Sequence, residues 1–93
     1  MENDSESYYK TAELLKVLAH PVRLCIVTGL LKNGGCNVSH MQSCLNEPQS
    51  TISQHLQKLK MAGVISGARK GKEINYRVSN KRIESLIKIL FPQ

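Results

Sequence analysis

The period of the apolar residues changes twice along this chain, and these changes constrain its fold. Up to residue 62 the apolar residues recur every three or four positions, which predicts helices. Residues 73–78 instead alternate polar and apolar side chains, as a half-buried strand does, and the run 64–66 predicts a partner strand. A helical period returns over 80–90. Because 93 residues support one domain at most, we expect residues 1–93 to form a single unit of helices with one β-hairpin.

Prolines and glycines divide the first part of the chain into four helices. We predict them over residues 8–18, 21–31, 38–45 and 49–62, and we expect residues 1–7 to form a disordered tail. The third and fourth helices are joined by a short turn, so they fit a helix-turn-helix, and the hairpin that follows makes a winged helix. The expected fold is therefore mainly α, with a small β-hairpin between the fourth and the fifth helix.

Each predicted helix has one apolar face, and these faces form the predicted core. The first and last helices have narrow apolar stripes, which a domain of this size covers poorly by itself. A two-fold homodimer that pairs these two helices with those of a second chain is the simplest cover. The residues predicted to face inward are Tyr8, Ala12, Leu15, Leu18 and Ala19 in the first helix, Leu24, Val27, Leu30 and Leu31 in the second, Val38, Met41 and Leu45 in the third, Ile52, Leu56, Leu59 and Met61 in the fourth, and Ile83, Leu86, Ile87 and Leu90 in the last.

Positive charge is concentrated in the second half of the chain. Residues 1–47 contain four Lys or Arg and five Asp or Glu, a net charge of −1, whereas residues 48–93 contain nine and two, a net charge of +7. A basic half on a small domain indicates a polyanionic partner. Residues 49–62 contain no carboxylate at all, although a solvated helix face usually carries Glu as well as Lys.

The fourth predicted helix has the side chains that a DNA recognition helix needs. Gln54 can both donate to and accept from an adenine edge in the major groove. Ser50, Thr51 and Ser53 can bond to bases or phosphates near the N-terminal end of the helix, where the positive dipole favours phosphate. We therefore predict that this helix reads double-stranded DNA.

Further candidate contacts come from the same helix and from the hairpin. His55 and Lys58 lie farther along the predicted exposed surface, and the hairpin turn adds Arg69, Lys70 and Lys72, which would contact phosphates or the minor groove. In a homodimer two such helices would address half-sites roughly 34–36 Å apart. The predicted target is a near-palindromic operator.

Several other classes of protein do not fit. There is no run of about 18 apolar residues, which a membrane span needs, and residues 1–7 are polar and acidic, unlike a secretory signal. We therefore expect a cytoplasmic protein, whose odd number of Cys does not suit a disulfide framework. No Ser/His/Asp set, Gly-rich phosphate loop or pair of carboxylates indicates an enzyme. A rival of the same fold is a winged helix that binds another protein without reading DNA.

Three stretches of the sequence form a pattern that is specific to one group of regulators. They are Leu18–Leu24 with its HPxRL pattern, Gln49–Leu56 with its SQHL pattern, and Ala62–Ile65. Together they resemble the ArsR/SmtB family of winged-helix repressors, and the resemblance extends over residues 12–90. It implies a homodimeric bacterial transcriptional repressor. The implied DNA contacts are Gln49, Ser50, Ser53, Gln54 and His55, with wing contacts from Arg69 to Lys72.

The metal sites of that family have no counterpart here. Its best-known members bind metal through a CxC pair that opens the third helix, where this chain has Asn37 and Ser39. Others use Asp and His ligands on the last helix, where Glu84 is the only carboxylate and His is absent. In this respect the chain is similar to PagR-like members without a metal site. We therefore expect no cofactor, and the sequence identifies no inducer.

Two arrangements of Cys and His leave open a sensor repressor of the same fold. Cys36, His40 and Cys44 are spaced by four residues and would share one helix face as ligands for Zn²⁺ or Cu⁺. The glycines before Cys36 indicate that it lies in a loop, which leaves two ligands. The other arrangement is a thiol switch at Cys25 in the second helix, for which pairing with Cys36 stays open.

Overall fold

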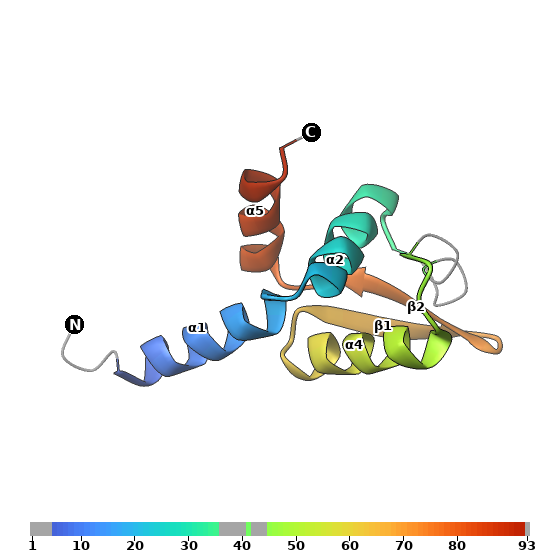
Figure 1. Ribbon diagram of the computed structural model, residues 1–93, viewed down its shortest axis with the longest axis horizontal. Helices are drawn as coiled ribbons and strands as arrows, with labels where there is room; N and C mark the ends of the chain where they lie inside the picture. Colours follow the sequence, from blue (N-terminus) through green and yellow to red (C-terminus); the bar gives the residue numbers. More distant parts are fainter. Residues whose placement is uncertain (1–4, 36–40, 42–44, 93) are drawn as a thin grey trace.

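The computed structural model describes residues 5–35, 41 and 45–92, and Figure 1 shows their arrangement. Four helices lie within these ranges: α1 (Ser5–Leu18), α2 (Pro21–Asn33), α4 (Gln49–Met61) and α5 (Lys81–Leu90). The strands β1 (Ile65–Lys70) and β2 (Glu73–Val78) form an antiparallel hairpin between α4 and α5. The sequence predicts five helices. The one expected over 38–45 lies outside the described residues, except for Met41 and Leu45.

α1 and α2 meet at a sharp break formed by Ala19 and His20. The backbone of His20 is extended, and its Nδ1 accepts a hydrogen bond of 3.1 Å from the Val22 N–H, which caps α2. Pro21 follows in the first turn, where a helix makes no use of an N–H. No single helix in the described part of the chain is long and apolar enough to cross a membrane; α1 and α2 reach the necessary length and composition only together, across a bend of 89°.

The hydrophobic core lies between α2, α4, the hairpin and α5. Val27, Ile52, Leu59 and Val64 are completely buried, so the centre of the core is the contact between α2, α4 and the start of the hairpin. Ile26 is also buried, although it lies outside the stripe predicted for the second helix. The other buried residues are Leu18, Leu30, Met41, Leu56, Ile65, Ile83 and Ile87, with Leu24, Leu31 and Leu86 packed around them.

The hairpin is longer than predicted and its turn is tighter. β1 continues to Lys70, which pairs with Glu73, so Gly71 and Lys72 form a two-residue turn. Gly71 has a φ of 63°, as the first position of such turns requires. Arg69 and Lys70, which the sequence placed in the turn, therefore belong to the strand.

Tyr76 packs across the hairpin and against the core. It pairs with Gly67 of β1, where an added Cβ would lie 3.1 Å from the ring atom Cε1. The glycine thus gives the ring room to lie over the neighbouring strand. The half-buried ring also contacts the hydrophobic core, which holds the wing against the body of the domain.

Several residues predicted to face the core are exposed instead. In α1 only Leu18 of the predicted stripe is buried, whereas Tyr8 and Leu15 are 62% and 49% exposed, and Ala12 and Ala19 are exposed as well. The reason is that α1 contacts the core through Leu14, Val17 and Leu18, on a different side of the helix. In α4 and α5 the wrong predictions are Met61, 78% exposed, and Leu90, 56% exposed, both at the last position of their helix.

The N-terminal part of α1 projects from the body of the domain (Figure 1), whose longest extent is 47 Å. α1 also begins at Ser5, three residues before the predicted start. The prediction of a disordered tail is therefore wrong for residues 5–7, while residues 1–4 lie outside the described part. The result is a helix with an uncovered apolar side.

We expect Leu59→Ala to lower the free energy of unfolding by about 2–5 kcal/mol, because it leaves a cavity at the centre of the core. Met61→Ala, two positions along on the exposed side of the same helix, should change it by no more than about 0.5 kcal/mol. Urea denaturation followed by circular dichroism measures both. Similar losses in the two variants would contradict the orientation of α4.

Candidate nucleic-acid interface

α4 presents a continuous polar stripe to solvent. Ile52, Leu56 and Leu59 hold its other side in the core, so the exposed stripe runs through the polar Ser50, Gln54 and Gln57, at spacings of four and three residues, and it ends at the apolar Met61. Ser50 and Gln54 are therefore exposed, as a recognition helix requires. Gln57 was not among the predicted DNA contacts, although its position three residues after Gln54 places it on the same stripe.

The N-terminal end of α4 offers backbone donors, and the nearest acid in the sequence is Glu47, directly before the N-cap residue Pro48. Pro48 occupies the N-cap position and its side chain makes no capping hydrogen bond. The first turn contains no acidic residue, and Gln49 and Ser50 are exposed, with Thr51 half-buried. The N–H groups of a first helical turn and the helix dipole both favour an anion at such an end. The predicted polar contacts thus surround a position suited to a phosphate.

The cationic wing lies at the same end of the molecule as the start of α4 (Figure 1). Arg69 and Lys70 at the end of β1 and Lys72 in the turn are exposed, and β1 packs against α4. Ser53 and Lys58 are exposed on α4 itself. Helix and wing therefore form one surface that carries positive charge.

His55 is half-buried, so the prediction that it lies on the exposed surface of the fourth helix is wrong, as it is for Thr51. For His55 the reason is a polar cluster between α1, α2 and α4. His55 Nδ1 accepts a hydrogen bond of 3.1 Å from Arg23 Nε, and Arg23 Nη1 donates to the Val17 carbonyl oxygen at 2.9 Å. The His20 ring lies against the His55 ring, with a centroid separation of 4.5 Å.

The surroundings of His55 favour its neutral form. Burial lowers the pKa of His55 below its ordinary value of 6.5, and its electrostatic interactions with His20 and with the Arg23 guanidinium lower it further. In the neutral ring the unprotonated Nδ1 accepts from Arg23, which leaves the proton on Nε2. His55 is thus an acceptor inside the domain as well as a candidate DNA contact.

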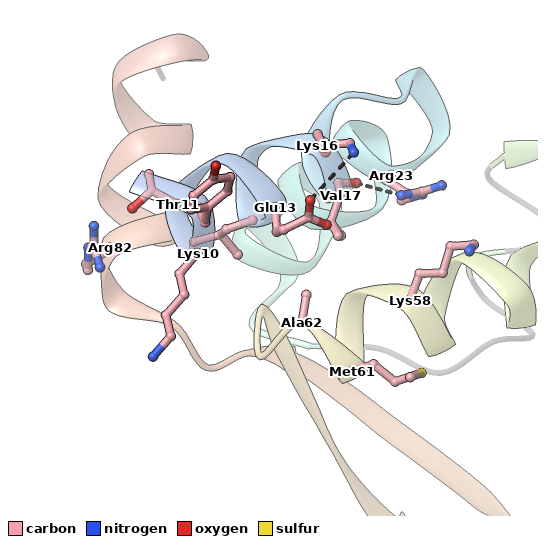
Figure 2. Close-up of a pocket in the computed structure, with 12 residues that line it drawn as sticks. Lys10, Thr11, Glu13, Lys16, Val17, Arg23, Lys58, Met61, Ala62 and Arg82 are labelled. Carbon is pink, nitrogen blue, oxygen red and sulfur yellow. Dashed lines mark hydrogen bonds and ion pairs between the residues drawn. The ribbon is translucent and has the colours of Figure 1, made fainter. Parts of the chain in front are cut away.

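An open groove of about 890 Å³ separates α1 from the C-terminal end of α4 (Figure 2). Figure 2 shows Arg23 bonded to the Val17 carbonyl at one end of the groove, and an ion pair of 3.6 Å between Lys16 and Glu13 on α1. The groove is lined by charged and apolar side chains. All but one of the charged residues are cationic: Lys10, Lys16, Arg23, Lys58 and Arg82, with Glu13 as the acid. The apolar lining includes Leu14, Val17, Met61 and Ala62.

The candidate sensor residues are only partly described. Cys25 is an exposed, free cysteine on α2. Cys36, His40 and Cys44 lie outside the described residues, as do Asn37 and Ser39, so the metal and thiol arrangements that involve them stay predictions. Within the described ranges no three His, Cys, Asp or Glu side chains are placed to hold a metal ion. Glu84 on α5 forms an ion pair of 3.0 Å with Lys88.

Comparison with known proteins identifies the family. A helix-turn-helix domain model matches residues 18–67. The transcriptional repressor PagR of Bacillus anthracis is 47% identical over 81 residues, which cover 87% of this chain and 81% of PagR. The crystal structure of PagR has a TM-score of 0.83 and covers 91% of this chain and 97% of that one, at 45% identity. The chain belongs to the ArsR/SmtB family.

As an ArsR/SmtB protein, the chain is a DNA-binding transcriptional repressor and not an enzyme. The repressor SmtB of Mycobacterium tuberculosis is 41% identical over 75 residues; this match covers 81% of the chain and 55% of SmtB. A homodimeric winged helix-turn-helix DNA-binding domain of Mycobacterium bovis has a TM-score of 0.85 at 24% identity, covering 97% of this chain and 82% of that one, which shows the shared fold.

Acidification should destabilise this ArsR/SmtB repressor through His55. Because the pKa of His55 is lowered on folding, the unfolded chain binds a proton at a pH where the folded chain does not. The stability contributed by neutral His55 is therefore complete above about pH 6.5, and it is lost as the pH falls from there through the lower pKa of the folded state. His55→Asn keeps an acceptor that does not titrate, so its free energy of unfolding should fall less between about pH 7.5 and about pH 5.5. Urea denaturation at both pH values measures the difference, and equal losses in wild type and variant would rule out this role of His55.

Proposed function

We propose that this repressor binds a near-palindromic operator as a homodimer, with α4 of each subunit in the major groove. The observation that carries this proposal is the exposed stripe of Ser50, Gln54 and Gln57 on a carboxylate-free helix beside a cationic wing. Side chains of this kind read base edges, while cations and helix N-termini hold phosphates. The same surface therefore supplies both specificity and affinity.

Each group of residues has a proposed task at the DNA. Gln54 reads a base edge, and Gln57 extends this reading by one helical turn. The start of α4 holds a phosphate, with Gln49, Ser50, Thr51 and Ser53 around it, and Lys58 contacts the backbone on the far side. Arg69, Lys70 and Lys72 follow the flanking phosphates or the minor groove. His55, bonded through Nδ1 to Arg23, has only its Nε2–H left for DNA.

The exposed apolar residues of α1 and α5 support the proposed dimer. Tyr8 and Leu15 on α1, and Ile89, Leu90 and Phe91 at the end of α5, are large apolar side chains exposed in one chain. A two-fold axis would bury both sets against their copies in the partner. The Mycobacterium bovis domain of the same fold is described as homodimeric. Two copies of α4 would then lie roughly 34–36 Å apart.

A sensor role at Cys25 is a second candidate. The thiol is exposed on α2, where an oxidant in solution would reach it. The candidate metal ligands Cys36, His40 and Cys44 lie outside the described residues, so no observation of exposure or geometry supports them. Binding-site selection with and without peroxide distinguishes a redox-responsive repressor from one that ignores oxidants.

Selection of bound duplexes from a random pool should yield a site with two related half-sites. Gln54→Ala should then relax the base preference at one position in each half-site, at a cost of about 1–3 kcal/mol. Lys70→Ala should weaken binding to all sequences alike and reduce the salt slope by about one. Lys88→Ala on α5 is the matched control and should change neither. A protein-binding winged helix remains the alternative, and it gains if neither substitution alters DNA affinity.

The affinity for the selected duplex should depend steeply on salt. If a dimer neutralises about 6–10 phosphates, the association constant falls about 10³–10⁵-fold between 50 and 200 mM salt. Fluorescence anisotropy titrations at four salt concentrations give the slope. A nearly flat dependence would exclude the proposed phosphate contacts of the wing.

Leu15→Glu should convert the dimer to a monomer, because it places a charge in the proposed apolar interface. Gln57→Glu adds the same charge on the exposed side of α4, and it should leave the oligomeric state unchanged. Sedimentation velocity at micromolar concentration measures both. If both variants remain dimeric, the interface does not include Leu15.

A further inference from the structure

We propose that Arg23 is a positioning residue for DNA recognition, which fixes α4 relative to α1 by bonding to His55 and to the Val17 carbonyl at once. The inference rests on the proposed function, because it assigns α4 to the DNA and α1 to the dimer contact. It differs from the role of a DNA contact, since Arg23 acts from the interior side of α4.

The guanidinium of Arg23 has the geometry that this role requires. Nε donates to His55 Nδ1 at 3.1 Å, and Nη1 donates to the Val17 carbonyl oxygen at 2.9 Å. Two donors with different directions on one rigid plane define both the distance and the angle between their acceptors. Arg23 itself belongs to α2, so the bridge joins three helices.

The Val17 end of the bridge lies at the C-terminal end of α1. Carbonyl groups in the last turn of a helix lack partners within the helix, and a cation is favourable there. The N–H groups of Ala19 and His20 bond to the carbonyls of Lys16 and Leu18, and Arg23 serves the carbonyl between them. The sharp break after α1 therefore depends on an arginine from the next helix.

The His55 end of the bridge is also connected to that break. The His20 ring lies against the His55 ring at a centroid separation of 4.5 Å, and His20 Nδ1 caps α2 through the Val22 N–H. Beyond this cluster the boundary between α1 and α4 widens into the open groove (Figure 2). Polar bonds thus fix the relative position of α1 and α4 where apolar packing is incomplete.

The bridge links the dimer contact to the DNA contact. α1 carries the exposed Tyr8 and Leu15, whereas α4 carries Gln54 on its outer side and His55 at the bridge. A change in the angle between α1 and α4 would therefore change the spacing of the two recognition helices in a dimer. Half-sites at a fixed spacing of about one helical turn would then be bound less well, while non-specific contacts to phosphates would persist.

The bridge also requires an unprotonated His55 Nδ1. Among the described residues, the charged or titratable groups around His55 are His20 at the break, Arg23 on α2, Glu47 before α4 and Lys58 on α4. Of these four, Glu47 alone favours a proton on the ring. Protonation would remove the acceptor and place a second positive charge beside Arg23. Specific DNA affinity should consequently decline at acid pH through this contact.

The test compares three variants of the chain with wild type: Arg23→Lys, His55→Asn and the control Arg82→Lys, an exposed arginine that lines the same groove. The probes are the duplex selected with wild type and a random-sequence duplex. Lysine keeps the charge but its single ammonium group cannot replace the two-way bridge. Arg23→Lys should bind the selected duplex at least about tenfold more weakly, with the random duplex within about twofold of wild type. Arg82→Lys should match wild type on both.

The pH profile provides a readout that a general loss of stability would not reproduce. The ratio of selected to random affinity should fall for wild type between about pH 7.5 and about pH 5.5, and it should stay flat for His55→Asn, which cannot titrate. Since this variant keeps an acceptor, it tests the bridge even if Arg23→Lys fails to fold. The same decline in wild type and His55→Asn would overturn the proposal.

The outcomes separate this proposal from the proposed function. If wild type does not prefer the selected duplex, operator recognition fails and the positioning role falls with it. If wild type prefers that duplex and a folded, dimeric Arg23→Lys prefers it equally, the positioning role alone is overturned.

Discussion

Ile52, Leu56 and Leu59 lie on one side of α4 and are buried against α2 and the hairpin. Because the helix has a period of 3.6 residues, burying these three leaves Ser50, Gln54 and Gln57 on the opposite side. The orientation of the candidate interface is thus a consequence of hydrophobic burial, which is the dominant favourable term in folding. The orientation of α4 does not depend on the side chains of the polar stripe, so these residues can be suited to DNA binding without altering the core.

The polar cluster of His20, Arg23 and His55 holds α4 at a defined angle to α1. Burial fixes which side of α4 faces outward, whereas the bonds of Arg23 to His55 and Val17 fix how α4 lies relative to α1. The two motifs that resemble the ArsR/SmtB family, HPxRL and SQHL, meet at this point through His20, Arg23 and His55. In the sequence these motifs are separated by about thirty positions, so their contact appears only when the chain folds.

The sequence predicted the elements well and the environments of some side chains less well. Periodicity correctly predicted α1, α2, α4, α5 and the alternating strand Glu73–Val78, because both patterns follow from local geometry. The helix predicted over 38–45 stays a prediction, since most of it lies outside the described residues. Periodicity was wrong for Leu15, Leu90 and Met61, since an apolar stripe shows which side of a helix is apolar but not which partner covers it. His55 was wrong for a related reason, because its partners Arg23 and His20 belong to another part of the chain. Gln57 could have been found from its spacing to Gln54. The base sequence of the operator follows from no local pattern in the chain. The DNA contacts inferred for α4 and the wing stay predictions.

The central claim is that two copies of α4 occupy successive major grooves on one side of a duplex. Hydroxyl-radical footprinting on the selected duplex tests it most directly, because it maps the protected backbone at single-nucleotide resolution. We expect two protected regions related by a two-fold axis, with centres about 10–10.5 base pairs apart. A single protected region, or protection without a two-fold relation, would contradict the account.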